Sequence, residues 1–568
     1  MGLSSALQVG KSGLFASQTA VEVAGNNLAN IGTRNYHRQS VNITPNGTTP
    51  VGPGLYVGNG VKIADITREV NQQLEARLRS AIADQSGSKI TADLLTQIES
   101  IENELSGVDL STELQDFFNA WSDLAGNPQD DSLRSLAVEQ GRSLANFIRG
   151  LDEQYGRVQR QVNDSIYGAV GEVSNLLDQI ETINNEISTQ EAGQTEIGTL
   201  RDQRDGLLAD LSKYLDISTS ERNNGEVDIF VGSTAIMLDG KNLGVEVDNR
   251  VVNGEMKTLV VAGEEKQPLD VSAGEIGAML AFRDENLAQS QSRLDTLASQ
   301  LVWQVNRLHA QGHGESGFES VTGRYGVADA TAPLSDADAT ALPFTPAHGS
   351  FKVHVTDKTT GQRTTTTINV DLDGINPASD TTLTSLVTDL DAVTGLSASI
   401  TAGGQLRLDA DDDFTFGFSD DRAGALAALG VNSYFTGSDA TDLAVDDAVA
   451  ADPTRLAVSQ TPGASDNLNA LAIAGLATQG MSGLGGLSLS SYWERHVETG
   501  ALNLARAEQA LEADSNVRSN LETQRESVSG VNVDEETINL MTYQRSYQAS
   551  ARFITVVDEL MQTLLGLV

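Results

Sequence analysis

Four apolar residues recur at intervals of seven near the start of the chain: Leu7, Leu14, Val21 and Leu28. The small residues Gly10, Ser17 and Ala24 lie between them. A seven-residue apolar repeat is typical of a helix that packs lengthwise against another helix. We expect this helix to stop near Asn26-Asn27, where Gly32 and a polar stretch begin a loop. The first segment therefore needs a helical partner.

A broader apolar stripe closes the chain. Its residues follow at steps of three and four: Leu540, Tyr543, Tyr547, Ser550, Ile554, Val557, Met561, Leu564 and Val568. A second row, formed by Phe553, Leu560 and Leu567, predicts more than one neighbour for this helix. Gly530 breaks the preceding helix, and Asn532 or Asp534 can cap this one by accepting hydrogen bonds from its free N–H groups.

The middle of the 568-residue chain combines long helices with β-rich regions. Apolar residues at helical spacing predict helices at about 151–187, 287–308 and 492–528. Alternation at Val227, Ile229 and Val231, with turn signals at Asp239-Gly240 and Asn253-Gly254, predicts strands within 217–261.

A second β region is expected at about 344–435. One strand face carries Phe351, Val353 and Val355, and its partner carries Ile368, Val370 and Leu372. A short helix with Leu383, Leu386, Val387 and Leu390 follows, and then strands with Leu406, Leu408, Phe414, Phe416 and Phe418.

These patterns predict a mostly α protein with β insertions, an α+β multidomain chain. Residues 1–65 and 530–568 are expected to pair as a terminal coiled-coil domain. Residues 66–330 and 440–529 are expected to form a long helical bundle with a small β subdomain at 217–265. Residues 331–439 are expected to form a β-rich inserted outer domain.

Composition excludes several classes of function. Asp and Glu total 78 against 37 Lys and Arg, a formal charge of −41 that phosphate backbones repel, so nucleic acid is not an expected partner. No apolar run reaches the ~20 residues that a membrane span needs. The absence of cysteine removes disulfides and thiolate chemistry. Because no basic segment precedes an apolar run after Met1, we expect no cleaved signal peptide.

Candidate metal sites are weak. His309 and His313 stand four residues apart, a spacing that can hold a metal on a helix, but Gly312 and Gly314 indicate that the helix has ended. Surface or capping histidines are the favoured interpretation. Asp409, Asp411 and Asp413 resemble the start of a calcium loop that lacks its glycine and its final Glu. An acidic strand edge is favoured there.

Catalytic motifs are not supported either. The glycines at 52, 54, 58 and 60 lack a following GK[ST], so we expect a loop rather than a phosphate cradle. There is no GxSxG and no HExxH. We therefore expect a protein without enzymatic activity.

Both ends also carry specific motifs. The first includes Ser12-Gly13-Leu14, Asn27-Leu28-Ala29-Asn30, Thr33 and Tyr36-His37-Arg38-Gln39. The last includes Gly530-Val531-Asn532-Val533-Asp534-Glu535-Glu536, then Tyr543 to Ala549 and Asp558-Glu559. Together they resemble the terminal motifs of bacterial flagellar axial proteins.

Within that family the chain is most similar to hook–filament junction subunits. The Tyr36-x-Arg38-Gln39 ending, the long helices after it, and Val305-Asn306-x-x-His309-x-x-Gly312 carry this likeness. Arg34-Asn35 stands where the family usually has Pro-Gly. Because Asn tolerates left-handed backbone better than most residues, we expect the turn to survive.

The resemblance implies a structural subunit that joins hook and filament, templates filament assembly and lacks cofactors. Both terminal helices would pair in the inner tube. The implied partners are further copies in a ring, the hook protein below and a second hook-associated junction protein above. A cytoplasmic chaperone would bind the C-terminal helix before export through the type III apparatus to the cell exterior. We expect residues 534–568 to be disordered in the monomer and to fold on assembly.

Two sets of residues would form these interfaces. The N-terminal set is Leu7, Leu14, Val21, Asn27, Leu28, Asn30, Tyr36, Arg38 and Gln39. The C-terminal set, shared with the chaperone, is Leu540, Tyr543, Tyr547, Ile554, Val557, Met561 and Leu564. The alternatives are a hook or distal rod subunit, or an adhesin-like role for the β insert.

Overall fold

The computed structural model describes residues 2–52, 54–102, 109–191, 196–252, 255–375, 379–461 and 466–566. The chain divides into two compact units, each built from separate stretches of sequence. Unit 1 comprises Met1–Leu94, Gln161–Phe282 and Ala505–Val568, and unit 2 comprises Leu95–Arg160 and Arg283–Leu504. The expected division into three domains is finer than this and stays a prediction.

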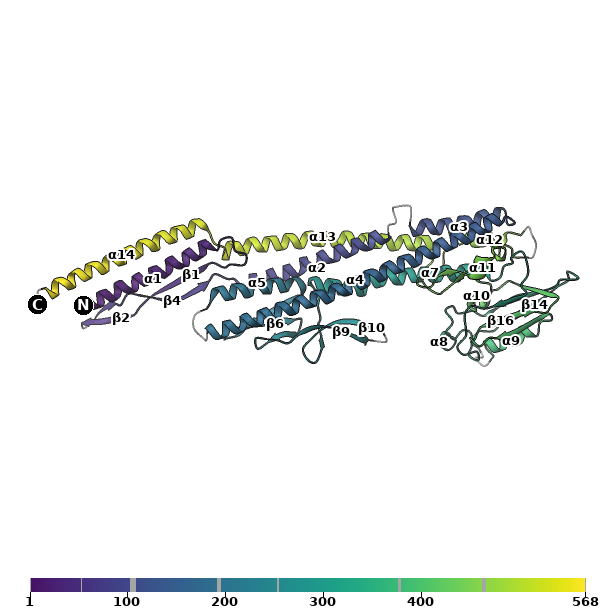
Figure 1. Cartoon of the computed structure of the whole chain (residues 1–568), viewed down its shortest axis with the longest axis horizontal. Helices are drawn as coiled ribbons and strands as arrows, with labels where there is room; N and C mark the ends of the chain where they lie inside the picture. The colour runs from purple at the N-terminus through teal and green to yellow at the C-terminus, as the bar shows by residue number, and fades with distance from the viewer. Residues whose placement is uncertain are drawn as a thin grey trace. The chain divides into compact units, whose positions relative to one another are not determined.

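Unit 1 holds both ends of the chain (Figure 1). Helix α1 (Leu3–Ala29) extends slightly beyond the predicted stop and lies beside α14 (Val533–Leu565). Between α1 and α2 (Gln72–Glu102) lie four strands: β1 (Gln39–Pro45), β2 (Thr48–Gly52), β3 (Leu55–Gly58) and β4 (Val61–Arg68). The glycine-rich stretch predicted to be a loop is therefore mostly hairpin. Antiparallel pairing of β2 with β3 and of β1 with β4 gives its backbone groups their partners.

The rest of unit 1 is a helical bundle with a small β subdomain. The bundle contains parts of α2, of α4 (Asp131–Glu191) and of α13 (Leu489–Ser529), with α5 (Gly198–Tyr214) and α6 (Gly274–Ala281). Leu74, Leu78, Ala81 and Ile82 of α2 form a core cluster with Leu521 of α13. The predicted long helices are thus confirmed, and α4 is the longest at 61 residues.

The β subdomain follows α5. One sheet has the order β5-β6-β7-β8, with β5 (Ile217–Glu221), β6 (Val227–Val231), β7 (Thr234–Leu238) and β8 (Lys241–Asn242). The other pairs β9 (Val245–Val252), β10 (Glu255–Ala262) and β11 (Gln267–Pro268). Val227, Ile229 and Val231 are buried as predicted. Asp239 and Gly240 both have positive φ, 54° and 70°, which confirms that turn. The signal at Asn253-Gly254 lies outside the described residues.

Unit 2 begins with helices. Helix α3 (Leu110–Gly126) and the first part of α4 precede a π-helical turn (Phe282–Leu287) and α7 (Ala288–His309). After the insert come α11 (Asp447–Ala451), α12 (Leu468–Gly475) and the first part of α13, with 3-10 turns at Pro453–Arg455 and Ser482–Leu484.

The inserted region of unit 2 contains two small sheets around an apolar cluster that also contacts Trp303 of α7. One sheet has the order β14-β13-β17, with β13 (Gly349–Asp357), β14 (Arg363–Val370) and β17 (Phe414–Ser419). A second joins β12 (Ser320–Thr322), β16 (Leu406–Ala410) and β15 (Leu396–Ile400). Phe351 lies opposite Ile368, which confirms the predicted strand pair. The short elements are α8 (Ala337–Thr340), α9 (Leu383–Asp391), α10 (Ala425–Ala428), β18 (Phe435–Thr436) and β19 (Ala444–Val445).

No helix in the described ranges combines the length and the apolar content needed to cross a membrane.

Candidate assembly site at the joined ends of the chain

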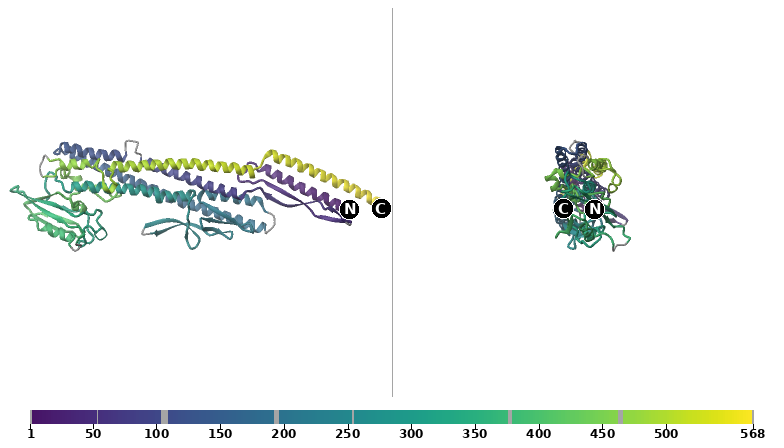
Figure 2. Two further views of the ribbon diagram at one scale, coloured as in Figure 1. Left: turned by 180° about the vertical axis from the view of Figure 1, so that it is seen from behind. Right: turned by 90° about the vertical axis from the view of Figure 1, so that its right-hand side faces the viewer.

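Helices α1 and α14 pack closely and run antiparallel (Figures 1 and 2). A Cβ added to Gly10 would lie 2.8 Å from Cγ1 of Ile554, and one added to Gly13 would lie 3.0 Å from Oγ of Ser550. These distances leave almost no room for a side chain. Small residues therefore let the two helix backbones approach.

The predicted N-terminal interface residues do not all share one environment. The buried positions of α1 are mostly small: Gly10, Ala16, Ser17, Ala20, Val23, Ala24 and Asn27. The heptad residues Leu7, Leu14, Val21 and Leu28 are only half-buried. The heptad repeat correctly predicts the helix, but the residues between the heptad positions are the ones buried in the structure.

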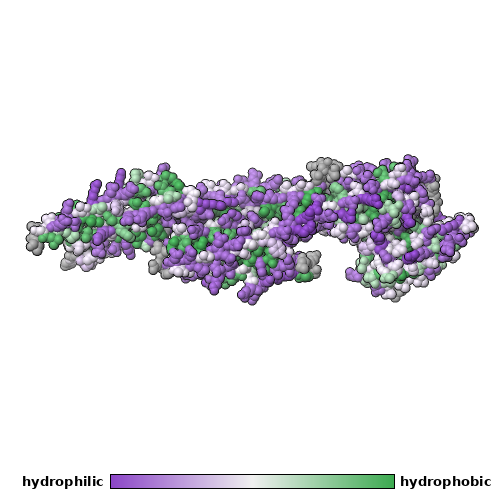
Figure 3. Space-filling model, in the orientation of Figure 1, coloured by the Kyte–Doolittle hydropathy of each residue, from purple (hydrophilic) through white to green (hydrophobic). Residues whose placement is uncertain are grey.

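The C-terminal stripe lies partly against α1. Val557 is buried, Leu540, Tyr543, Ile554 and Met561 are half-buried, and Tyr547 and Leu564 are exposed. A further apolar row remains exposed along α14, with Phe553, Val556 and Leu560 at 44%, 52% and 52%. Ile538, Met541 and, on α1, Phe15 are exposed as well. Figure 3 shows apolar surface at this end of unit 1.

Asn27 joins three segments of unit 1 in one buried position. Its amide nitrogen donates to the Gln39 carbonyl at 2.8 Å and to Glu536 Oε2 of α14 at 3.3 Å. Its oxygen accepts from the Tyr36 hydroxyl at 2.8 Å and from the Gln39 N–H at 3.0 Å. Burial, with Asp202 and Glu536 nearby, raises the pKa of Tyr36 to about 12, so this hydroxyl keeps its proton at neutral pH.

The loop after α1 also holds the start of α14. The Arg38 guanidinium pairs with Glu535 at 3.0 Å, and its backbone N–H donates to the Ser529 carbonyl at 2.9 Å. Asn532 caps α14 as predicted, accepting from the N–H groups of Asp534 and Glu535. Asn30 bonds only within its own end of α1 and the following turn.

The departure at Asn35 is accommodated as expected. Its φ is 62°, in the left-handed region that Asn tolerates. Its side-chain oxygen accepts a hydrogen bond from Arg525 of α13 at 3.2 Å. The turn therefore survives without glycine and gains a contact to the segment before α14.

His37 is buried in a network of charged side chains. Its Nδ1 lies 2.7 Å from Asp202 and its Nε2 lies 3.5 Å from Glu75. Arg68 pairs with Asp202 and Asp205, each at 2.7 Å. Burial lowers the pKa of His37, but the bonds to the two carboxylates outweigh it and raise the pKa to about 9. The imidazole is therefore a cation at neutral pH.

The positions of His37, Asp202 and Asp205 would also suit a metal ion. A metal would need the imidazole uncharged, and it would compete with Arg68 for both carboxylates. The ion-pair network is therefore the better description. Sequence patterns missed Asp202, Asp205 and Arg68, because nothing in their spacing marks them as partners of a residue more than a hundred positions away.

The side chains of Asn306 and His309 on α7 bind backbone groups in the segment that follows the insert. The Asn306 side chain donates to the Phe435 carbonyl at 2.8 Å and accepts from the N–H groups of Tyr434 and Phe435. His309 bonds the Asn432 carbonyl at 2.7 Å and the Ala457 N–H at 3.1 Å. Of the two expected environments, surface or capping, the surface one was wrong for His309, which is fully buried with both ring nitrogens bonded to backbone groups.

Comparisons with known proteins match the helical part and both ends. A family profile described as "Flagellar hook-associated protein FlgK helical domain" matches residues 95–322. Flagellar hook-associated protein 1 of Escherichia coli strain K12 is 26% identical over 100% of both chains. That of Bacillus subtilis strain 168 is 25% identical over 99% of this chain and 97% of its own.

Over its whole length the chain is similar to flagellar hook-associated protein 1, and its helical part matches the profile of that protein. Its two ends match profiles described as "Flagella basal body rod protein", at residues 7–37, and "Flagellar basal body rod FlgEFG protein C-terminal", at 523–567. The helical match between them separates the hook-associated protein 1 family from rod proteins, whose profiles account for the ends alone.

A solved structure supports the fold. The flagellar hook junction protein FlgK from Burkholderia pseudomallei aligns with a TM-score of 0.50 at 17% identity, covering 80% of this chain and 100% of that one. The mostly α fold with β insertions predicted from the sequence is therefore confirmed, and it is the fold of a hook-associated protein 1 relative.

Proposed function

We propose that this chain is a structural subunit of the bacterial flagellum that forms the junction between hook and filament and templates filament assembly. The family supports the role, and the joined ends supply its physical basis. The observation that carries it is the exposed apolar row of α14, which no described residue of this chain covers. Such a surface on a protein of −41 formal charge favours burial against another protein.

The occupants we propose for this surface are further copies of the chain in a ring, the hook protein on one side and a second hook-associated junction protein on the other. The N-terminal and C-terminal residue sets predicted from the sequence would contribute to these contacts. Before assembly a cytoplasmic chaperone would cover α14, and the type III apparatus would export the chain to the flagellum. No catalytic role is proposed.

Deletion of the gene tests this function. We expect hooks without filaments, with unpolymerised flagellin released to the medium and measured by immunoblot. Normal filaments in the deletion strain would overturn the assignment.

A point variant tests the surface itself. Phe553→Gln and Leu560→Gln, combined, should leave the fold intact and fail to restore filaments. Val517→Gln is the matched control, because Val517 is an apolar residue 50% exposed on α13, outside the proposed surface. Restoration by the α14 variant equal to that by the control would contradict the proposed contact.

A further inference from the structure

Unit 1 contains a cavity of about 270 Å³ between α2, α5 and strands β5 and β6. Three arginines line it: Arg68 from β4, Arg79 from α2 and Arg204 from α5. The hydroxyl of Thr219 on β5 lines it as well. Cationic donors from three elements and a hydroxyl from a fourth thus converge here in a strongly acidic chain.

Arg79 lacks a carboxylate partner. Its Nη2 donates to Thr219 Oγ1 at 3.0 Å, and within the described residues no carboxylate lies within 4.0 Å of its guanidinium. Its Nε is buried without a hydrogen-bond partner in the same set. Burial lowers the pKa of Arg79, and the nearby carboxylates of Asp205 and Glu75 offset only part of this effect.

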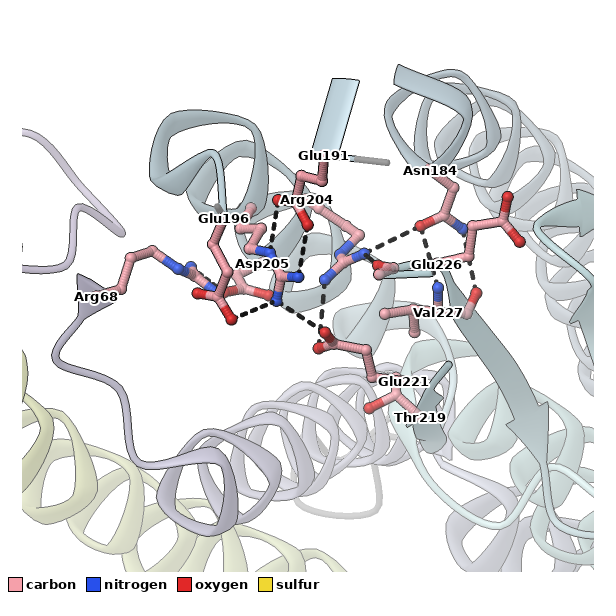
Figure 4. Close-up of polar contacts among 12 residues, drawn as sticks. Arg68, Asn184, Glu191, Glu196, Arg204, Asp205, Thr219, Glu221, Glu226 and Val227 are labelled. Atoms are coloured by element: carbon pink, nitrogen blue, oxygen red, sulfur yellow. Dashed lines mark hydrogen bonds and ion pairs between the residues drawn. The ribbon is translucent and has the colours of Figure 1, made fainter. Parts of the chain in front are cut away.

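Arg204 is still more enclosed, at 1% exposure. Its Nη1 donates to the Gly225 carbonyl and to Asn184 Oδ1, at 2.5 and 3.2 Å (Figure 4). Glu221 is 3.7 Å from its Nη2, but the same side chain pairs more closely with Arg201, at 2.7 Å. The Nε of Arg204 is also buried without a partner among the described residues.

The carboxylates in the cavity wall are already engaged. Asp205 pairs with Arg68 at 2.7 Å, and Glu221 pairs with Arg201. Glu75 lies 3.5 Å from the His37 imidazolium. None of them lies within 4.0 Å of Arg79. The unmet hydrogen-bonding capacity therefore consists of guanidinium N–H donors.

We propose that this cavity binds one oxyanion between the guanidinium groups of Arg79 and Arg204. The Thr219 hydroxyl accepts from Arg79, so its own proton is free to donate to the same anion. Guanidinium groups bind phosphate, sulfate and carboxylate oxygens through charge-assisted hydrogen bonds. The source is either a dissolved inorganic ion or an acidic side chain of a neighbouring copy. This inference does not depend on the junction role.

Binding to the purified full-length chain tests the site. Sodium phosphate, sulfate or acetate is compared with sodium chloride at equal ionic strength, by thermal unfolding and isothermal calorimetry. We expect at least one oxyanion to raise Tm above its value in chloride. Arg79→Gln should raise the Kd about tenfold or more, because it removes a charged hydrogen-bond donor.

Arg77→Gln is the matched control. Arg77 lies on α2 two positions away, is exposed and does not line the cavity. It should bind the anion as the unmodified chain does. Thr219→Val is a second variant, which keeps the volume and removes the hydroxyl, and it should also weaken binding. Circular dichroism checks that each variant is folded.

Comparison of the salts distinguishes the two possible sources of the anion. Tighter binding of phosphate or sulfate than of acetate assigns a dissolved ion, whereas acetate as good as phosphate assigns a carboxylate side chain. An equal Tm in all four salts would overturn the proposal. So would an oxyanion effect that Arg79→Gln and Arg77→Gln reduce equally, since that would be non-specific screening.

Discussion

Asn27 shows how many hydrogen bonds one side chain contributes to the joint, the contact of α1 and its following loop with α14. An amide carries donors and an acceptor together, so the same residue serves a carbonyl, a hydroxyl, an N–H and a carboxylate. Because Glu536 is itself buried, loss of the Asn27 donor leaves its carboxylate with weaker compensation.

We predict that Asn27→Ala destabilises the joint by about 2–4 kcal/mol, since several buried polar groups lose their partners at once. Hydrogen exchange at residues 533–545 in the assembled protein, where this segment is expected to be protected, measures the effect and should quicken. Asn30→Ala is the control, because Asn30 bonds only locally. Equal exchange in both variants would contradict the role of Asn27.

His37 gives the joint a dependence on alkaline pH. Its pKa is about 9 in the folded chain and ~6.5 when unfolded, so the folded state binds the proton more tightly. This stabilisation is complete below pH ~6.5 and disappears as the pH rises through about 9. We predict that the free energy of unfolding of unit 1, measured in urea, falls by about 3 kcal/mol over that pH window. His37→Gln should flatten the profile, and an unchanged slope would contradict the assignment.

At the scale of elements, the α1–α14 pair depends on where glycine stands. Gly10 faces α14, whereas a Cβ on Gly25 of the same helix would meet nothing within 4 Å. The two positions thus separate close packing from helix propensity.

We predict opposite signs for substitutions at these positions. Gly10→Val should weaken the pairing by about 1–3 kcal/mol through overpacking against Ile554 and Phe553. Gly25→Ala should stabilise α1 by about 0.5–1 kcal/mol, because alanine restricts the unfolded chain and favours helix. Chemical denaturation followed by hydrogen exchange in α1 and α14 decides between them. If Gly10→Val raised the free energy of unfolding, that result would contradict close packing of the two helices at this position.

The elements also show which features of the fold can be predicted from sequence patterns. Both terminal helices, the cap at Asn532 and the left-handed Asn35 follow from local rules, and all four are confirmed. Strands β1 and β4 were missed because their alternation is weak and Ile43 is exposed. The His37 network and the oxyanion cavity were missed for a different reason: their members meet only through the tertiary fold.

At the scale of the whole molecule, α14 is held by few buried groups. Only Glu536 and Val557 of its described residues are fully buried. A helix with so little burial opens at low free-energy cost.

We therefore predict that residues 534–568 exchange their amide protons far faster in the monomer than those of α4. Mass spectrometry after brief exposure to deuterated water measures this. Protection should appear when the chaperone or neighbouring subunits are added. Protection of the isolated monomer equal to that of α4 would contradict the expectation that this segment folds on assembly.

The bond between Asn27 and Glu536 spans 509 positions of sequence. A ribosome has made nearly the whole chain before the partner of α1 exists, and loop closure over that length is among the latest steps of folding. A product whose synthesis stops before α14 has no partner to cover the row of small residues on α1. The joint therefore distinguishes finished chains from fragments, because only a chain that contains both α1 and α14 can form it.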